Sequence, residues 1–280
     1  MQTRVFGSTG IRVPVVGQGT YRMEGDNRRE AVRALRAGLD AGATHVDTAE
    51  MYGDGRVEEI LAEALAGRRD EVYLVSKVLP QNASRRGAVE ACEKTLARLH
   101  TDRLDCYLLH WAGSHPLIET FAAFEQLLAT GKILSYGVSN FDERELAKAV
   151  RLLGPGRIAC NQVLYHLADR KIEHAVLPLC EKHGIALVGY TPFGDAFPGP
   201  STAGGRVLAE IAANHGATPR QAALAFLTRK PALFAIPKAA KAPHATENAV
   251  AGDLTLTGAD IARIDAAFPL GKRKKRFGIL

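Results

Sequence analysis

The chain has 280 residues, of which 46% are hydrophobic and 24% are charged. This composition is ordinary for a globular protein and excludes the collagen-like, disordered and disulfide-scaffold classes. The formal net charge is +6, and part of the excess lies in residues 271–276. Because that basic segment has no interleaved aromatic residues and no recognition motif, we interpret it as a solvated tail and expect no nucleic-acid partner.

Apolar runs and cysteines indicate the compartment. No apolar run approaches the roughly 18 residues of a membrane span, and no basic segment leads into an apolar run at the N-terminus. We therefore expect a cytoplasmic protein without a membrane partner. We also expect a monomer. The four cysteines form no C-x-x-C pair, which predicts buried thiols rather than a zinc site, a redox dithiol or a disulfide framework.

The opening segment alternates polar and apolar residues around Gly7 and Gly10, which predicts a β-hairpin within residues 1–14 that closes one end of a barrel. Short apolar runs then alternate with amphipathic runs, which predicts β/α units around a parallel sheet. The expected strands are residues 15–19, 44–47, 72–77, 104–110, 133–139, 159–162, 186–190 and 233–236. The expected helices are residues 28–41, 57–65, 88–99, 118–130, 143–153, 173–183, 205–215 and 219–228, with a further helix at 257–267. Asp142 and Thr218 are the expected N-caps of two of these helices.

Eight strands predict a single (β/α)8 TIM barrel over residues 1–280, with a short basic tail at 268–280. The rival architecture is an open doubly wound sheet, which would carry G-x-G-x-x-G at its first turn. The chain instead reads Gly17-Gln-Gly-Thr-Tyr-Arg22, with arginine in place of the third glycine. We therefore favour the barrel, and we interpret Gly17 and Gly19 as a tight turn where the backbone approaches a ligand.

In such a barrel the functional residues lie at the carboxyl ends of the strands. Asp47, Lys77 and His110 end the second, third and fourth expected strands, and Tyr52 follows Asp47 in a loop. A tyrosine, with an ordinary pKa of about 10, becomes a proton donor at neutral pH when a nearby cation lowers that pKa. We expect Lys77 to be the cation, Asp47 to hold its ammonium group, and His110 to orient a substrate carbonyl or share the proton. Each residue alone has an ordinary structural explanation, but the four together favour catalysis.

Several segments carry a family resemblance. Gly42-Ala-Thr-His-Val-Asp47-Thr-Ala-Glu-Met-Tyr52-Gly53 resembles the signature of the aldo-keto reductases. Val75-Ser-Lys77-Val and Leu108-Leu-His110-Trp111 resemble the lysine and histidine strands of that family. Gly137-Val-Ser139-Asn140-Phe and Asn161-Gln162 resemble the ends of its fifth and sixth strands, and Ile236-Pro-Lys238 and Glu247-Asn248 resemble its coenzyme clamp.

The resemblance implies an enzyme that reduces small aldehydes or ketones with hydride from NAD(P)H. It implies that Tyr52 is the general acid, with Asp47, Lys77 and His110 completing a catalytic tetrad, and that Tyr190 stacks on the nicotinamide. The implied coenzyme contacts are Gly19, Thr20, Asp47, Ser139, Asn140, Gln162, Tyr190, Thr191, Phe193, Gly194, Lys238, His244, Glu247 and Asn248. The expected lining of the substrate pocket is Tyr21, Tyr52, His110, Trp111 and Phe193.

The coenzyme clamp departs from the pattern of many NADPH-specific members. Ala239 stands where they have serine, and His244 stands where they have the arginine that grips the 2′-phosphate. Histidine is a weaker phosphate partner than a guanidinium group. We expect NADPH because Lys238 and Lys241 remain cationic, with dual use of NADH as the alternative. The whole pattern resembles bacterial members that reduce methylglyoxal-type dicarbonyls or diketo sugar acids.

Two other classes of function are alternatives to the reductase. One is a coenzyme-binding regulatory or accessory subunit, against which the intact set of four polar residues and the lack of an N-terminal extension both argue. The other is a metal-dependent barrel hydrolase, which needs clustered histidine and carboxylate ligands at strand ends. His45, His110 and His166 are dispersed, and only His110 ends an expected strand, so no metal site is expected.

Overall fold

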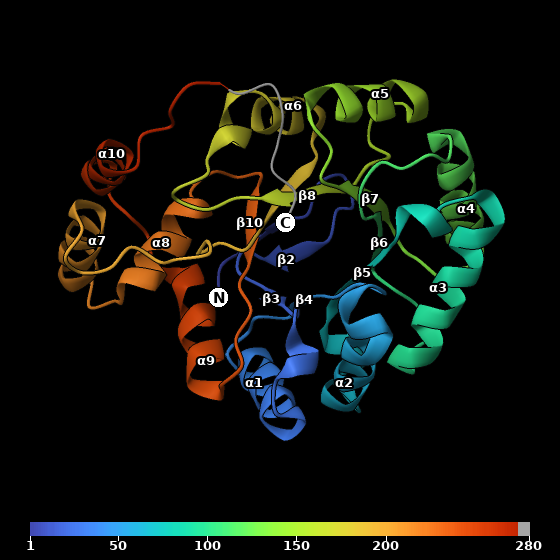
Figure 1. Cartoon of the computed structure of the whole chain (residues 1–280), viewed down its shortest axis with the longest axis horizontal. Coiled ribbons are helices and arrows are strands. Elements are labelled where there is room, and N and C mark those ends of the chain that lie inside the picture. Colours follow the sequence, from blue (N-terminus) through green and yellow to red (C-terminus); the bar gives the residue numbers. More distant parts are fainter. Residues whose placement is uncertain (274–280) are drawn as a thin grey trace.

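A computed structural model describes residues 1–273. It contains an eight-stranded parallel sheet in the order β10-β9-β8-β7-β6-β5-β4-β3. Isolated bridges from Val16 to Ala235 and from Gly19 to Lys238 join the two edges of this sheet. The sheet therefore closes into a barrel with helices packed around it (Figure 1). This closure confirms the (β/α)8 prediction and excludes the open doubly wound sheet.

The strands lie where the sequence patterns predict them, although several are shorter. The predicted first strand, 15–19, retains only two residues because Val16 makes an isolated bridge to β10 rather than a continuous ladder. Leu104 and Ile133 likewise pair as an isolated bridge ahead of the strands they were expected to begin. The strands are β3 (Gln18–Gly19), β4 (His45–Asp47), β5 (Tyr73–Val78), β6 (Cys106–Leu109), β7 (Tyr136–Ser139), β8 (Cys160–Leu164), β9 (Ala186–Tyr190) and β10 (Leu233–Ile236).

The predicted helices also form, and the two expected caps are confirmed. Asp142 accepts hydrogen bonds from the amides of Arg144 and Glu145, and Thr218 accepts one from Gln221. The prediction of a helix over 173–183 was wrong at its start, because Lys171–His174 form a 3-10 turn before α6. The helices are α1 (Arg28–Asp40), α2 (Arg56–Leu65), α3 (Arg85–Leu99), α4 (Leu117–Ala129), α5 (Glu143–Leu153), α6 (Val176–His183), α7 (Ala203–Asn214), α8 (Pro219–Leu227), α9 (Ala242–Val250) and α10 (Gly258–Ala267).

Helix α9 was not predicted. Its residues were interpreted only as a coenzyme clamp, although Pro243 near the start of α9 is a common signal for a helix N-terminus. Helix α9 packs against α1, so it covers the seam where β10 meets β3 (Figure 1). The chain that follows β10 is thus held firmly beside the barrel mouth.

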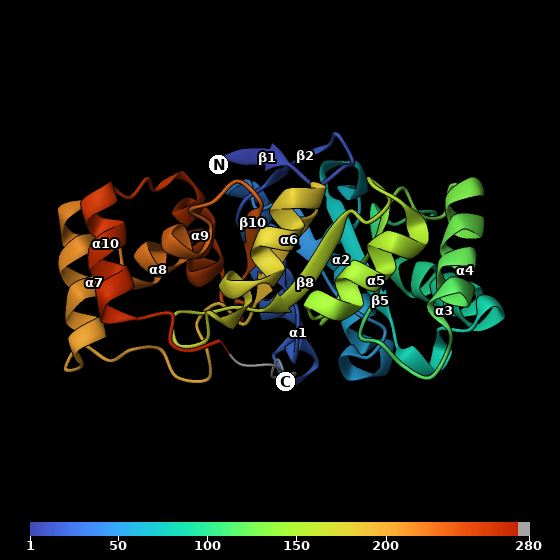
Figure 2. The same cartoon turned by 90° about the horizontal axis from the view of Figure 1, so that it is seen from above.

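The predicted hairpin is present and covers the amino-terminal end of the barrel. β1 (Thr3–Val5) pairs antiparallel with β2 (Arg12–Pro14), and both lie on one side of the barrel (Figure 2). Phe6 is fully buried, with its ring 5.0 Å from that of Tyr73 and 5.5 Å from that of His45. Because Tyr73 and His45 begin β5 and β4, the hairpin fills the closed end and leaves the opposite end for the site.

Alternation along the strands places polar groups at that opposite end. Tyr73 and Val75 of β5 belong to the apolar core inside the barrel, and the period of two brings Lys77 to the same inner face near the end of the strand. The four cysteines are free and buried, as expected. Within residues 1–273 no helix is both long and apolar enough to span a bilayer. Of the predicted basic tail, residues 274–280 lie outside the described part of the chain.

Candidate active site

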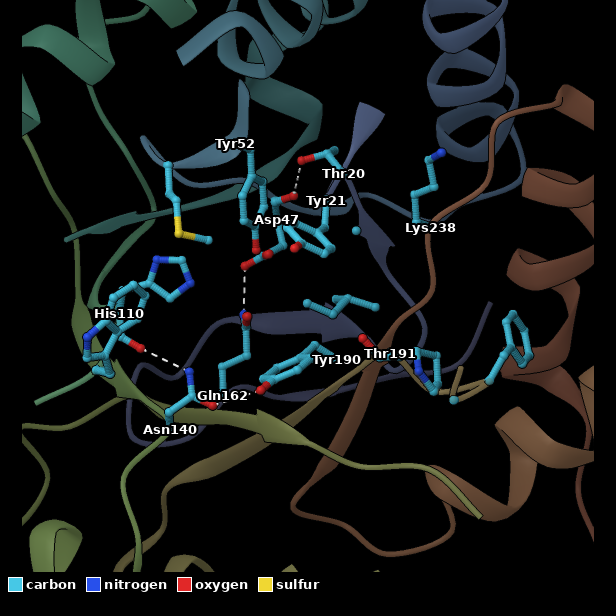
Figure 3. Close-up of a pocket in the computed structure, with 17 residues that line it drawn as sticks. Thr20, Tyr21, Asp47, Tyr52, His110, Asn140, Gln162, Tyr190, Thr191 and Lys238 are labelled. Atoms are coloured by element: carbon cyan, nitrogen blue, oxygen red, sulfur yellow. Dashed lines mark hydrogen bonds between the residues drawn. The ribbon is translucent and has the colours of Figure 1, made fainter. Parts of the chain in front are cut away.

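A cavity of about 220 Å³ opens at the carboxyl end of the barrel strands (Figure 3). It is bordered by loops that follow six of the strands, so residues distant in sequence meet there. The lining residues are Gly19, Thr20, Tyr21, Asp47, Met51, Tyr52, His110, Trp111, Asn140, Gln162, Tyr190, Thr191, Pro192, Phe193, Gly194, Ile236 and Lys238.

Lys77 lies beneath this cavity with no exposed surface. Its ammonium group donates to Asp47 Oδ1 at 2.6 Å, to the Thr48 carbonyl oxygen at 2.8 Å and to the Tyr52 hydroxyl at 3.1 Å. An ammonium group has three protons, so these three acceptors use all of its donors. Such full pairing is what allows a charged lysine to be buried.

Asp47 is fixed by a second set of contacts. Its Oδ2 accepts from Gln162 Nε2 at 2.7 Å, and its backbone oxygen accepts from the Thr20 hydroxyl at 2.8 Å (Figure 3). Asp47 ends β4, Thr20 directly follows β3, and Gln162 lies within β8. Asp47 therefore connects Gln162 and Thr20, from two other strands, to the buried ammonium group of Lys77.

Charge and burial set the protonation of Lys77. Burial by itself lowers the pKa of Lys77, but the nearby Asp47 and Tyr52 outweigh it, and the net pKa is raised. Lys77 is therefore a permanent cation at neutral pH.

The pKa of Tyr52 differs from the sequence-based expectation. Burial raises the pKa of Tyr52 and outweighs the lowering effect of Lys77, so the net shift is upward. The expectation that Lys77 brings this pKa below its ordinary value was wrong, because it did not include the cost of ionising a buried phenol. Tyr52 consequently keeps its proton at neutral pH, with a cation 3.1 Å from its oxygen.

His110 directly follows β6, and its ring centroid lies 6.1 Å from that of Tyr52. Burial, with a smaller contribution from the charge of Lys77, lowers the pKa of His110 to about 2. Its Nδ1 is buried without a hydrogen-bond partner in the described residues. The imidazole is therefore neutral at physiological pH.

Asn140 lies on the opposite wall of the cavity and links neighbouring strand ends by hydrogen bonds. Its backbone has a positive φ of 60°, a conformation that asparagine adopts more readily than most residues. Its amide donates to the His110 carbonyl oxygen at 3.1 Å, and its Oδ1 accepts from the Tyr190 hydroxyl at 2.9 Å. Ser139 donates to the Gln162 carbonyl oxygen at 2.9 Å. These bonds hold the ends of β6, β7, β8 and β9 at fixed separations.

Aromatic rings form the outer rim. The ring centroids of Tyr21 and Tyr52 are 5.2 Å apart, and those of Trp111 and His110 are 4.7 Å apart. Met51, Pro192 and Ile236 also line the cavity but were not predicted. They are apolar and carry no chemical signature, although each adjoins a residue or lies within a segment that the sequence analysis singled out.

Four of the expected coenzyme residues do not line the cavity, namely Ser139, His244, Glu247 and Asn248. The Glu247 carboxylate accepts from the Thr218 hydroxyl at 2.6 Å, and Asn248 is buried against the seam between β3 and α1. Lys238 lines the cavity, but its ammonium group lies 2.5 Å from a carboxylate oxygen of Asp26. Across residues 1–273, no group of three or more His, Cys, Asp and Glu side chains is arranged to hold a metal ion.

A closed eight-stranded barrel with a buried Asp-Lys-Tyr cluster at the carboxyl ends of its strands is typical of a barrel enzyme, because this is the end at which such barrels carry their active sites. The sequence model of the aldo/keto reductase family matches residues 15–268, and the chain belongs to that family. It is thus an oxidoreductase, as predicted.

Relatives agree over nearly the whole chain. Methylglyoxal reductase YeaE of Escherichia coli (strain K12) is 44% identical, with 98% of each chain covered. Glyoxal reductase of Bacillus subtilis (strain 168) is 31% identical, over 92% of this chain and 90% of that one. The crystal structure of an aldo/keto reductase from Klebsiella pneumoniae, in complex with NADP and acetate, superposes with a TM-score of 0.92 at 42% identity and covers 100% of both chains.

Proposed function

We propose that this protein reduces the carbonyl group of small 2-oxoaldehydes, with NADPH as the hydride donor and Tyr52 as the proton donor. The observation that carries the proposal is the contact of the buried Lys77 ammonium group with both Asp47 at 2.6 Å and Tyr52 at 3.1 Å. Burial keeps the phenol protonated before the reaction, and the contact with Lys77 places a cation where negative charge develops as the proton leaves.

The cavity fits a nicotinamide coenzyme. Tyr190 offers an aromatic face, and Asn140 and Gln162 offer amide groups beside it, which match a ring that carries a carboxamide. Lys238 supplies a cation at the other end of the lining. When bound, the coenzyme supplies the hydride. NADPH is favoured over NADH because the related Klebsiella pneumoniae structures contain NADP or NADPH.

His110 and Tyr52 then define where the carbonyl oxygen is held. A neutral imidazole can donate one N–H to that oxygen but cannot deliver a proton as an imidazolium ion. Of the two roles expected for His110, the pKa of about 2 favours orientation of the substrate over a share in the proton transfer. Lys77 does not touch the substrate in this scheme, and it stabilises the Tyr52 phenolate that is left behind.

The substrate class follows from the size and lining of the cavity. Tyr21, Trp111 and Phe193 give its outer part aromatic walls, which suit a small carbonyl compound rather than a polyhydroxylated one. Two relatives are named for methylglyoxal and glyoxal reduction. We therefore favour 2-oxoaldehydes over diketo sugar acids.

Replacement of Tyr52 by phenylalanine tests the proton-donor role. Tyr52→Phe removes one hydroxyl and is expected to lower kcat for methylglyoxal by about 10²–10⁴-fold, the range that a general acid contributes. Binding of NADP⁺, measured by titration calorimetry, should be unchanged because the coenzyme contacts are kept. Near-normal turnover by the variant would contradict the role of Tyr52.

A panel of aldehydes and ketones, followed by loss of NADPH absorbance in the wild-type enzyme, tests the substrate class. We expect the highest kcat/KM for 2-oxoaldehydes, and a higher value for diketo sugar acids would contradict that choice. Negligible turnover of every compound, combined with intact coenzyme binding and a stable protein complex, would favour the alternative of a coenzyme-binding accessory subunit.

A further inference from the structure

Lys238 lies two residues after the end of β10 and lines the cavity, yet its charge is already paired. Its ammonium group lies 2.5 Å from Asp26 Oδ2. Figure 3 shows the Lys238 side chain extending away from Tyr52 and Asp47, toward the helix drawn in blue. The side chains of Lys238 and Asp26 are only 30% and 21% exposed, so solvent screens their attraction incompletely.

Both partners are held in place by their backbones. The Asp26 amide donates to the Met23 carbonyl oxygen at 3.1 Å, and Asn27, the next residue, is the N-cap of α1. Lys238 is bridged to Gly19 across the seam of the barrel. The ion pair therefore joins two segments whose backbones are fixed by hydrogen bonds. These backbone contacts keep the Asp26 carboxylate beside the Lys238 ammonium group.

The contact between Asp26 and Lys238 is electrostatic rather than directional. Asp26 Oδ2 is buried and makes no hydrogen bond of good geometry in the described residues. A charge pair of this kind offsets the positive charge of Lys238, but it can open when another anion competes for the ammonium group.

Two basic residues that follow Lys238 in the chain have no carboxylate partner in the part that the structure describes. Within residues 1–273, Lys241 at the N-cap position of α9 and His244 in its first turn form no ion pair. Lys238 thus has a specific carboxylate partner, which neither Lys241 nor His244 has in the described residues. Because Ala239 follows Lys238, no hydroxyl at that position adds a further donor.

We propose that Asp26 is a coenzyme-specificity residue that weakens the preference for a 2′-phosphorylated coenzyme by competing for Lys238. The inference rests on the proposed function, in which NADPH binds in this cavity, and it assigns the 2′-phosphate to Lys238, the cation at the far end of the lining. A phosphate monoester carries nearly two negative charges at neutral pH, so it must displace Asp26 from Lys238 or tolerate its repulsion. A coenzyme with a free 2′-hydroxyl brings no charge at that position and meets neither cost. Asp26 thereby brings the affinities for NADPH and NADH closer together.

Replacement of Asp26 by asparagine keeps the shape and removes the charge. In Asp26→Asn we expect the Kd for NADP⁺, measured by titration calorimetry, to fall about fivefold, because a partly exposed ion pair changes a binding constant by up to about that factor. The Kd for NAD⁺ should stay within about twofold of the wild-type value. Glu30→Gln is the matched control, because it removes one carboxylate nearby on α1 that pairs with Arg33 instead. The control should leave both Kd values unchanged.

A second background separates competition from a general charge effect. Lys238→Met should raise the Kd for NADP⁺ and leave that for NAD⁺ nearly unchanged. In the Lys238→Met background, Asp26→Asn should no longer tighten NADP⁺ binding beyond the small effect of one more removed charge, because the competed cation is absent. An equally large effect of Asp26→Asn in both backgrounds would overturn the competition.

The outcomes for this inference and for the proposed function are distinct. Unchanged or weaker NADP⁺ binding by Asp26→Asn, with Lys238→Met still losing NADP⁺ affinity and the wild type still reducing carbonyl compounds, would overturn only the role of Asp26. A wild-type protein that binds NADP⁺ but reduces no carbonyl compound would overturn the proposed function while leaving the binding comparison intact.

Discussion

Asp47 and Lys77 form a buried ion pair whose stability depends on complete pairing. Lys77 has three acceptors, and Asp47 accepts from both Lys77 and Gln162. Removing one partner of a buried pair is much more costly than removing both, because the remaining charge stays buried without compensation. The buried charges of Asp47 and Lys77 therefore stabilise the fold only when both are present.

This asymmetry gives a prediction for Asp47. We expect Asp47→Asn to lower the free energy of unfolding by about 3–5 kcal/mol, and to lower the pKa of Lys77, since burial alone acts in that direction. Urea unfolding at pH 7 provides the measurement. The double variant Asp47→Asn/Lys77→Met removes both charges and should be more stable than Asp47→Asn. Equal or lower stability of the double variant would contradict this account.

The amino-terminal hairpin acts as a single element that closes the barrel. Phe6 packs among the rings of His45, Tyr73 and Phe234 inside the barrel. Gly7, the next residue, has a φ of +54°, and a Cβ there would lie 2.0 Å from the Ala159 carbonyl oxygen. Only glycine permits this close approach, so the hairpin can seat its aromatic side chain deeply.

Two neighbouring residues of the hairpin test its contribution. Phe6→Ala should lower the free energy of unfolding by about 3–5 kcal/mol, the usual cost of truncating a buried phenylalanine. Val5 is 48% exposed, and Val5→Ala should change the same quantity by no more than about 0.5 kcal/mol. Denaturant unfolding monitored by circular dichroism distinguishes the two. Similar losses in both variants would mean that the hairpin does not close the barrel through Phe6.

For the whole molecule, buried neutral histidines couple folding to pH. His45 is fully buried, neither ring nitrogen has a hydrogen-bond partner in the described residues, and burial, with a smaller contribution from Lys77, lowers its pKa to about 3. In the unfolded chain a histidine has a pKa of about 6.5. Between these two values the unfolded state binds a proton that the folded state does not, so stability is lost as the pH falls from about 6.5 toward 3.

The pH dependence of Tm tests this coupling. In His45→Leu the titrating group is absent, and we expect Tm to fall less steeply between pH 6.5 and 4 than it does in the wild type, whatever the absolute Tm of the variant. His100 is exposed and occupies a left-handed C-cap that asparagine tolerates, so His100→Asn is the control that should keep the wild-type slope. A slope in His45→Leu equal to that of the wild type would refute the assignment.

Local patterns in the sequence determined the strand set, most of the helices and the positions of Asp47, Tyr52, Lys77 and His110. These features depend on residue spacing, because a period of two or of 3.6 and a cap residue are properties of short segments. The spacing of strand ends was enough to bring the Asp-Lys-Tyr cluster together, since parallel strands of a barrel end on one face.

Only the tertiary structure decided how those residues are charged and paired. The upward shift in the pKa of Tyr52 comes from burial, which depends on packing by distant segments. The contacts of Lys238 with Asp26 and of Glu247 with Thr218 join residues far apart in the chain. No periodicity encodes such pairs, because they form between loops and helix ends that meet only after the barrel has closed. For this reason, the class of chemistry was predictable from the sequence, whereas the partner of Lys238 at the cavity rim was not.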